Sequence, residues 1–242
     1  MEIFPLNEGS FTIDHTKEFI PFDTEVQELN ERPSGSLLVE IQPFCIRIHN
    51  EIIILDTGLG FNIDGEMQIH RNLKNVGIEP SDVTMVLLSH LHKDHAGGIS
   101  DSHHNKLTFP NAVYYIHEDE MKYAAEKGKP SYDPADFEFL RSHASCKKLT
   151  AVSGSVNDFI SFEISGGHCP YHTVFWIKDN EETAFFGGDV APQLQQMKRK
   201  FIAKYDADGR KSMELREQWW QKGQAENWTF LFFHDIHSGV YR

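Results

Sequence analysis

The stretch Ser89–Gly98 reads Ser-His-Leu-His-Lys-Asp-His-Ala-Gly-Gly and decides how this chain is interpreted. It places three imidazoles and one carboxylate within six positions, those of His90, His92, Asp94 and His95. The apolar run just before it, residues 85–88, is typical of a buried strand. Because side chains alternate along a strand, only a chain that leaves the strand and turns can aim these groups at one point. Imidazole and carboxylate are ligands for borderline divalent metals, so the stretch predicts a metal-binding loop.

This stretch resembles the His-x-His-x-Asp-His motif of the metallo-β-lactamase superfamily. In that family the first two histidines bind one metal, and the Asp and the last histidine bind a second. The resemblance therefore implies that His90 and His92 hold one ion, while Asp94 and His95 hold the other. A histidine-rich surface loop is the alternative, but the order of these residues after a strand and before two glycines favours the family.

Three later segments resemble further ligand segments of the family. Residues 166–172, Gly-Gly-His-Cys-Pro-Tyr-His, are similar to its Gly-His-Thr-Pro-Gly-His segment and imply His168 as a ligand. Residues 185–189 end in Gly-Gly-Asp, and the resemblance makes Asp189 the carboxylate that bridges two metals roughly 3.5–4 Å apart. Residues 230–235 imply His234 as the last ligand, with His237 as the second candidate.

The resemblance thus implies two ligand sets that share Asp189: His90, His92, His168 and Asp189 for one ion, and Asp94, His95, Asp189 and His234 for the other. We expect two divalent ions, zinc first, with iron or manganese as alternatives because these metals accept the same ligands.

Several neighbours of these segments are expected to play supporting roles. Asp56, in an Asp-Thr-Gly segment, either orients a metal ligand or caps a turn. His172 is expected either to support a metal ligand or to be structural. Cys169, next to a predicted ligand, could bind metal, but a buried packing role is favoured. Asp208 is expected to cap a helix.

The activity that the resemblance implies is that of a metal-dependent hydrolase, in which a hydroxide bridging the two metals attacks a small ester or lactone. Asp94 would be the catalytic residue, because it can orient the hydroxide and carry the proton to the leaving group. The length and the Asp189 bridge resemble the small lactonase branch, which opens acyl-homoserine lactones. That branch has a tyrosine where this chain has Pro192, so Tyr171 or Tyr205 would have to substitute.

Other functions stay open at this point. Residues 188–216 also resemble a broader group of family hydrolases that includes phosphotriesterase-like members, so a phosphotriester or another small ester is an alternative substrate. An iron-dependent oxidoreductase on the same scaffold is a second alternative, and a metal-binding protein without catalysis is a third. Residues 61–63 are expected to form one wall of the substrate cleft, because the family often uses that loop.

Composition narrows the partners and the compartment. The net charge of −13 argues against nucleic acid, which needs a basic footprint, and mildly against a strongly anionic substrate, although local metal charge can override it. No apolar run reaches membrane-spanning length and the N-terminus lacks a secretory pattern, so we expect neither a membrane partner nor a leader. Three scattered cysteines indicate a reducing compartment, the cytoplasm. The expected partner is a small-molecule substrate, and a homodimer is left open.

Hydropathy patterns predict strands and helices along the whole chain. Strands are expected over residues 36–48, 51–56, 85–88, 112–116, 159–165, 173–178, 183–186 and 228–233. Helices are expected over residues 66–76, 118–126, 135–145 and 210–222. This pattern alone predicts one α/β or α+β domain. The resemblance implies the metallo-β-lactamase fold, an α+β four-layer αβ/βα sandwich, as a single domain over residues 1–242.

Overall fold

Two sheets of six strands face each other in this computed structural model, which describes residues 1–101 and 106–242. The first sheet has the order β1 (Glu2–Pro5), β5 (Phe44–Ile48), β6 (Glu51–Leu55), β9 (Met85–Leu87), β12 (Val113–His117) and β13 (Cys146–Leu149). The second has the order β14 (Ser153–Ser155), β15 (Ile160–Ile164), β16 (Thr173–Asp179), β17 (Glu182–Phe186), β18 (Thr229–Leu231) and β19 (Val240–Tyr241).

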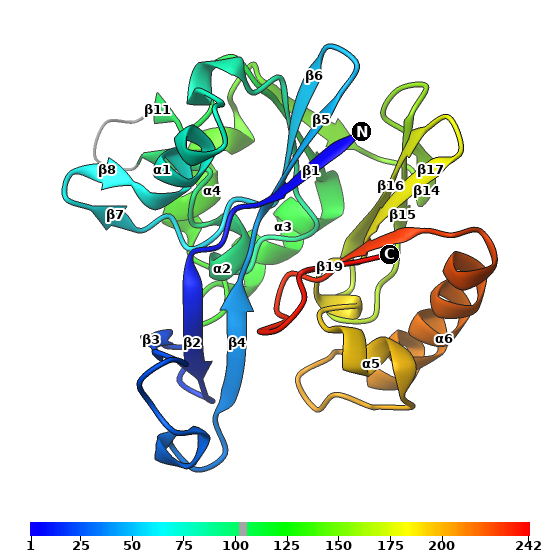
Figure 1. The fold of residues 1–242 in the computed structure, drawn as a ribbon. Helices are drawn as coiled ribbons and strands as arrows, with labels where there is room; N and C mark the ends of the chain where they lie inside the picture. The colour runs from blue at the N-terminus through cyan, green and yellow to red at the C-terminus, as the bar shows by residue number, and fades with distance from the viewer. Residues whose placement is uncertain (102–105) are drawn as a thin grey trace.

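Helices cover the outer face of each sheet (Figure 1). The first sheet carries α1 (Gln68–Asn75), α2 (Lys93–Ala96), α3 (Glu118–Lys127) and α4 (Pro134–Arg141). The second carries α5 (Leu194–Lys198) and α6 (Gly209–Ala225). The layers run helix, sheet, sheet, helix, which is the four-layer αβ/βα arrangement predicted from the sequence.

Smaller elements complete the chain. A three-stranded sheet, β3 (Ile20–Pro21), β2 (Gly9–Ile13) and β4 (Leu37–Ile41), extends as an arm below the first sheet in Figure 1. Two ribbons pair β7 (Asn62–Ile63) with β8 (Glu66–Met67) and β10 (Ser100–Asp101) with β11 (Lys106–Leu107). Short 3-10 turns are η1 (Leu29–Glu31), η2 (Pro80–Asp82) and η3 (Gly188–Val190).

Three apolar layers hold the sandwich together, because each sheet has one face to bury against its partner and one against helices. The layer between the sheets includes the fully buried Phe44, Phe175 and Phe186. The outer layers centre on Tyr114 under the first helices and on Phe230 under α6. Burial of this much aromatic surface is the main favourable term in folding such a sandwich.

Most predicted elements are present, but the single strand predicted over residues 36–48 is wrong. The chain forms β4 and β5 there, and these two strands belong to different sheets. The break falls at Gln42-Pro43, where Pro43 has no backbone N–H to donate to a ladder. The hairpin of β5 and β6 through His49-Asn50 is confirmed.

The helix predicted over residues 135–145 is also wrong at its end. It stops at Arg141, and Cys146–Leu149 forms the unpredicted strand β13, which pairs in parallel with β12. The predicted stop of α1 at Gly77 is confirmed. Gly77 has φ +74°, and its N–H and that of Ile78 donate to the last carbonyls of the helix.

The carboxyl ends of parallel strands meet at one edge of each sheet, and there the predicted site residues gather. β6 pairs in parallel with β9, and β17 with β18. Asp56 follows β6, residues 90–95 follow β9, Asp189 follows β17 and His234 follows β18.

No helix in the described part of the chain is long and apolar enough to cross a membrane.

Candidate metal centre and active site

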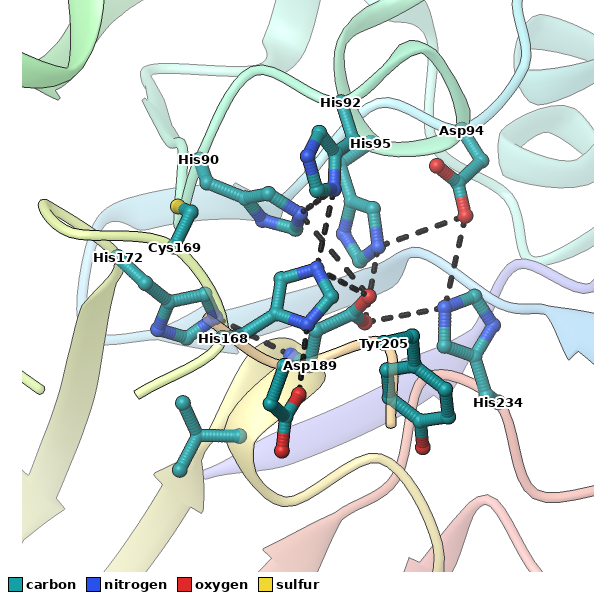
Figure 2. Close-up of polar contacts among 12 residues, drawn as sticks. His90, His92, Asp94, His95, His168, Cys169, His172, Asp189, Tyr205 and His234 are labelled. Atoms are coloured by element: carbon teal, nitrogen blue, oxygen red, sulfur yellow. Dashed lines mark hydrogen bonds and ion pairs between the residues drawn. The ribbon is translucent and has the colours of Figure 1, made fainter. Parts of the chain in front are cut away.

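Asp189 lies at the middle of the predicted ligand cluster, with one carboxylate oxygen turned to each side (Figure 2). Its Oδ1 lies 3.0 Å from His95 Nε2 and 3.0 Å from His234 Nε2. Its Oδ2 lies 3.2 Å from His168 Nε2 and 4.0 Å from His90 Nε2. The two oxygens therefore face two separate groups of side chains.

The first group converges through ring nitrogens. His92 Nδ1 lies 2.9 Å from His90 Nε2 and 3.0 Å from His168 Nε2. In the second group, Asp94 Oδ2 lies 3.7 Å from His95 Nε2 and 3.5 Å from His234 Nε2. Within each group the candidate ligand atoms all lie within 4.8 Å of one another. The structure thus brings all seven predicted residues together, and their role as ligands stays a prediction.

The outer ring nitrogen of four of these histidines has its own acceptor. His95 Nδ1 donates to Asp56 Oδ2 at 2.7 Å and His168 Nδ1 donates to Asp206 Oδ1 at 3.0 Å. His234 Nδ1 donates to the Glu40 carbonyl at 2.7 Å. A proton on the outer nitrogen leaves a lone pair on the inner one, which is the tautomer that binds a metal.

For His90 the acceptor is the Ser89 hydroxyl, at 3.0 Å from Nδ1. That hydroxyl donates its own proton to Asp56 Oδ2 at 2.6 Å, so it is free to accept from His90. Asp56 also accepts from the Ser89 N–H at 2.7 Å and is completely buried. Of the two roles expected for Asp56, orienting the ligands is therefore the one observed.

His172 and Cys169 lie beside the cluster in supporting positions, as expected. His172 Nε2 accepts a hydrogen bond from the Asp189 N–H at 3.1 Å, which fixes the backbone that carries the central carboxylate. Cys169 is buried, and its thiol donates to Glu120 Oε2 at 3.4 Å. The other oxygen of Glu120 accepts from the Leu91 N–H at 3.1 Å, between the first two histidines of the motif.

His237 lies outside the cluster. Its backbone N–H donates to Asp235 Oδ1 at 2.9 Å in the turn after β18. Of the two histidines considered at this end of the chain, only His234 reaches Asp189.

The protonation states of the first group suit metal ligands. Burial, reinforced by the neighbouring His95 and His92 rings, lowers the pKa of His90 well below its usual range, so its imidazole is neutral. Burial opposes ionisation of Asp189, but His234, His95 and His168 outweigh it and hold its pKa well below the usual range. Neutral imidazole and ionised carboxylate are the forms in which these side chains bind metals.

The second group attracts positive charge. Burial opposes protonation of His95, but the carboxylates of Asp189, Asp94 and Asp56 raise its pKa well above the usual value. In addition, His95 Nε2 and Asp189 Oδ1 face each other at 3.0 Å, and among the described residues neither atom makes a hydrogen bond of good geometry. Buried polar atoms are normally hydrogen-bonded. Two such atoms that face each other, each with a lone pair to give to a metal, fit a divalent cation.

A cavity of about 430 Å³ opens onto both groups. One wall is apolar and comes from the arm, with Ile13, Phe19 and residues 37–39, and the opposite wall includes Pro192, Phe201 and Tyr205. The wall predicted at residues 61–63 is wrong, because Phe61 and Ile63 line a separate depression beside Glu8 and Phe11. The arm, which the sequence did not indicate as part of the site, forms the cavity wall that was expected from that loop.

Of the two tyrosines considered as substitutes at Pro192, only Tyr205 lines the cavity. Tyr171 instead stacks on His117, with ring centroids 6.2 Å apart. In Figure 2 the Tyr205 ring lies beside Asp189, with its hydroxyl at the end farther from the ligand cluster. That hydroxyl accepts from Gln196 Nε2 at 3.1 Å, and burial raises its pKa to about 12.

Asp206 is a site residue whose role the sequence did not reveal. It lies two residues before Asp208, whose side chain accepts from the Lys211 N–H at 3.0 Å and caps α6 as expected. The Asp208 N–H donates to the Gly167 carbonyl at 2.8 Å, and this bond places Asp206 beside His168. The only available signal was the Asp-x-Asp spacing, which is explained by the helix cap alone.

Two ligand groups that share one carboxylate, buried at the floor of a cavity, are typical of enzymes that use a pair of divalent ions. A family profile described as the metallo-beta-lactamase superfamily matches residues 42–219. The chain therefore belongs to the metallo-β-lactamase superfamily. The predictions of this family, of its fold and of a metal-dependent hydrolase are confirmed at the level of the family.

Solved structures show the same fold at low sequence identity. A probable metal-dependent hydrolase from Staphylococcus aureus superposes with a TM-score of 0.81 at 22% identity, over 99% of this chain and 91% of that one. AidC, a dizinc quorum-quenching lactonase solved with a product, gives 0.75 at 20% identity, over 98% and 88%. The hydrolase AbOPH of the beta lactamase superfamily gives 0.73 at 23%, over 98% and 88%. No curated protein matches this chain.

Proposed function

We propose that this protein hydrolyses a small ester or lactone with two divalent metal ions. The observation that carries the proposal is the placement of Asp189, whose two oxygens face separate groups of histidine and carboxylate donors 3.0 to 4.0 Å away. His90, His92 and His168 would hold one ion with Asp189. Asp94, His95 and His234 would hold the other, and zinc is the metal we propose for both.

Two such ions supply Lewis acidity and make water acidic enough to act as a nucleophile near neutral pH. The chain's own residues supply orientation and proton transfer. Asp94 is nearly buried and lines the cavity, so its carboxylate is placed to orient a water molecule and to hold the proton that the leaving group needs. The apolar wall of Ile13, Phe19 and residues 37–39 excludes bulk water from the reacting atoms.

The similarity to AidC, described as a lactonase in complex with N-hexanoyl-L-homoserine, supports a lactone as one substrate class. The apolar wall is suited to an acyl chain. Pro192 replaces the lactonase tyrosine. Of the two tyrosines considered as substitutes, Tyr171 stacks on His117, and the Tyr205 hydroxyl lies at the end of its ring farther from the ligand cluster. We therefore expect the protein to hydrolyse both esters and lactones, without the strict preference for lactones that such a tyrosine hydroxyl would add.

The test is Asp189→Ala, compared with Asp158→Ala as a matched control on an exposed turn. Elemental analysis of the Asp189 variant should find one metal equivalent or less in place of two, and hydrolysis should fall by roughly 1,000-fold or more, since the shared ligand is lost. The Asp158 variant should keep both. Full turnover in the Asp189 variant would contradict the dinuclear site.

The substrate class is tested on metal-loaded protein with a panel of acyl lactones, aryl esters and phosphotriesters. Hydrolysis of lactones and aryl esters supports the proposal, and exclusive hydrolysis of phosphotriesters would replace it with the alternative named from the sequence. Protein with two metal equivalents that leaves every compound intact would contradict hydrolase activity on these classes.

We also propose that the protein works in the cytoplasm on a small molecule, without a nucleic-acid or membrane partner. The three free cysteines, two of them buried, support a reducing compartment. Fractionation of the native cells would test the location, and sedimentation of purified protein would decide whether it forms a homodimer.

A further inference from the structure

Three basic side chains line the cavity above the ligand cluster: Lys17, Arg32 and Lys93. Among the described residues, the only carboxylates that line the cavity are Asp94 and Asp189, and both belong to the ligand cluster. The upper part of the cavity therefore carries positive charge with no carboxylate in its own lining to balance it.

This concentration is unusual for so acidic a chain, which has 36 acidic and 23 basic residues. Some basic side chains elsewhere in the chain pair with carboxylates, such as Lys74 with Glu66 at 2.7 Å, Lys122 with Asp119 at 3.1 Å and Arg47 with Glu2 at 3.0 Å. By contrast, within residues 1–101 and 106–242 none of the three cavity cations has a carboxylate within ion-pair distance.

Local backbone structure sets the positions from which the Lys17 and Arg32 side chains extend. Lys17 has φ 62°, and its N–H donates to the Asp14 carbonyl at 3.1 Å, which closes a tight turn between β2 and β3. The Asp14 carboxylate accepts instead from the N–H and hydroxyl of Thr16, at 2.8 and 2.6 Å. Arg32 follows η1, and its Nε donates to the Leu29 carbonyl at 3.0 Å, which leaves its two terminal nitrogens for another acceptor.

Lys93 is held from the opposite side of the cavity. Its N–H donates to the Ser131 carbonyl at 3.0 Å, and its Nζ lies 5.6 Å from the centre of the Phe19 ring. Asp133 and Asp136 are the carboxylates that feel its charge, and Asp133 has its own ion pair with Lys129 at 3.0 Å. Neither of these two carboxylates lines the cavity.

We propose that the substrate carries an anionic group, a carboxylate or a phosphate, that is distinct from the bond to be cleaved and is bound by Lys17, Arg32 and Lys93. This inference rests on the hydrolase proposed above and names its substrate class: an ester or lactone with an apolar chain along Ile13 and residues 37–39 and a negative end group. The net charge of the chain had argued mildly against such a substrate. For a bound substrate, the local charge of the cavity outweighs the net charge of the chain, because apolar walls focus the field of nearby cations.

The expected effect is substantial because a charge-assisted contact is stronger than a neutral one. Loss of one such contact lowers affinity by roughly tenfold. Arg32 can bind a planar anion through two nitrogens, while Lys17 and Lys93 act as point charges. Removing any one cation should therefore weaken binding of an anionic substrate more than binding of its neutral counterpart.

Matched aryl esters test the proposal on the metal-loaded protein. The p-nitrophenyl esters of hexanoate, of adipate and of 6-phosphonooxyhexanoate share one chain length and differ only in the end group. We expect kcat/KM for an anionic ester to exceed that for the neutral ester, chiefly through KM, and the advantage to shrink at high salt. The ratio should fall roughly tenfold in Lys17→Met and in Arg32→Met, and Lys178→Met, the same charge change on the exposed end of β16, should leave it unchanged.

Binding of the products gives a readout that does not depend on turnover. By calorimetry, adipate should bind roughly tenfold more tightly than hexanoate, and the difference should disappear in the Lys17 and Arg32 variants. A larger advantage for the phosphorylated ester would identify phosphate as the group recognised, and one for the adipate ester would identify carboxylate. Equal kcat/KM for charged and neutral esters, with equal product binding, would overturn the anion site while leaving the hydrolase intact. Hydrolysis of none of them would count against the hydrolase, and the calorimetric comparison would still decide the anion site.

Discussion

Asp56 accepts three hydrogen bonds in the interior, two from Ser89 and one from His95. The residue follows β6 in a left-handed conformation with φ 56°, and its carboxylate faces the motif that follows β9. The same carboxylate thus fixes the backbone at the start of the motif and the tautomer of its last histidine. Partners of this kind commonly change metal affinity by about 10- to 100-fold when they are removed.

We therefore expect Asp56→Ala to weaken binding at the group that contains His95. Asp206→Ala is a matched variant, because Asp206 makes the equivalent contact with His168 in the other group. Titration with a chelating competitor should show one weakened and one nearly normal site in the Asp206 variant, with a loss of about 10- to 100-fold at the weakened site. In the Asp56 variant the loss should be largest at the group of His95 and smaller at the group of His90, which Asp56 reaches only through the Ser89 hydroxyl. Two sites of unchanged affinity in both variants would show that these carboxylates do not orient the ligands.

Glu8 links pH to stability at a single buried residue. Its Oε2 accepts from the Leu59 N–H at 2.7 Å, while its Oε1 is buried and has no hydrogen-bond partner within residues 1–101 and 106–242. Burial raises the pKa of Glu8 from 4.5 to about 8, so the carboxyl takes up a proton when the chain folds in neutral solution. Its contribution to stability is complete below pH 4.5 and is lost as the pH rises through about 8.

Glu8→Gln should remove this loss. Urea unfolding between pH 5.5 and 8.5 should show the wild type losing stability relative to the variant, by at most about 3.5 kcal/mol over this range. Glutamine keeps the oxygen that accepts from Leu59, so the comparison isolates ionisation. Parallel stability curves for the two proteins across this range would contradict the buried, protonated carboxyl.

At the scale of elements, the sequence predicted well wherever the signal was local. The helical spacing before Gly77 predicted α1, and the long amphipathic run predicted α6 within three residues of its ends. Local patterns failed where a strand joins a distant partner. No element was predicted at Cys146–Leu149, and its parallel pairing with the distant β12 is what makes this segment a strand. Residues 36–48 looked continuous because apolar content does not reveal a change of sheet.

The same distinction applies to the candidate site. The residues of the predicted ligand cluster follow strands in short motifs that resemble those of the family, so the sequence named all seven. The cavity wall could not be predicted, because Lys17 and Arg32 belong to an arm that is built by pairing of β2 with β4, which lies more than twenty residues away in the chain. The Glu40 acceptor of His234 is a backbone carbonyl, which has no sequence signal of any kind.

The contact between α6 and β18 gives a prediction for an element. Alanine normally stabilises a helix interior by about 1 kcal/mol relative to glycine. At Gly223 an added Cβ would overlap the Phe230 ring, which is completely buried and packs against Trp220 and Trp228. Overpacking of this kind costs about 1–3 kcal/mol, so Gly223→Ala should destabilise the protein.

Urea unfolding checks this expectation, with Gln221→Ala on the exposed side of α6 as a control that should change little. The double variant Gly223→Ala, Phe230→Leu should be less destabilised than the sum of the two single changes, because the smaller side chain makes room for the added carbon. An increase in stability for Gly223→Ala alone would show that the Phe230 ring can move aside.

At the scale of the whole molecule, the ligand cluster joins the two halves of the sandwich. His90, His92, Asp94 and His95 follow β9 of the first sheet, whereas His168, Asp189 and His234 come from the second sheet and its connections. Each of the two groups draws residues from both halves. An ion bound in either group would therefore cross-link segments that the apolar layer between the sheets already holds together.

Removal of metal should consequently lower the stability of the whole fold. A ligand that binds only the folded state adds about 4 kcal/mol when its concentration is 1,000 times its Kd. Treatment with a chelator should shift the urea midpoint downward, and added zinc should restore it.

The loss of structure should start at the ligand cluster. Without metal, the ligand side chains repel one another and some of their polar atoms stay unpaired, while the layer around Phe44 and Phe186 stays packed. Hydrogen exchange should accordingly accelerate first in residues 89–97, 187–191 and 232–236. Asp189→Ala, which has already lost the shared ligand, should respond much less to the chelator. Complete removal of metal with no change in the midpoint would show that the apolar layer alone holds the two halves in place.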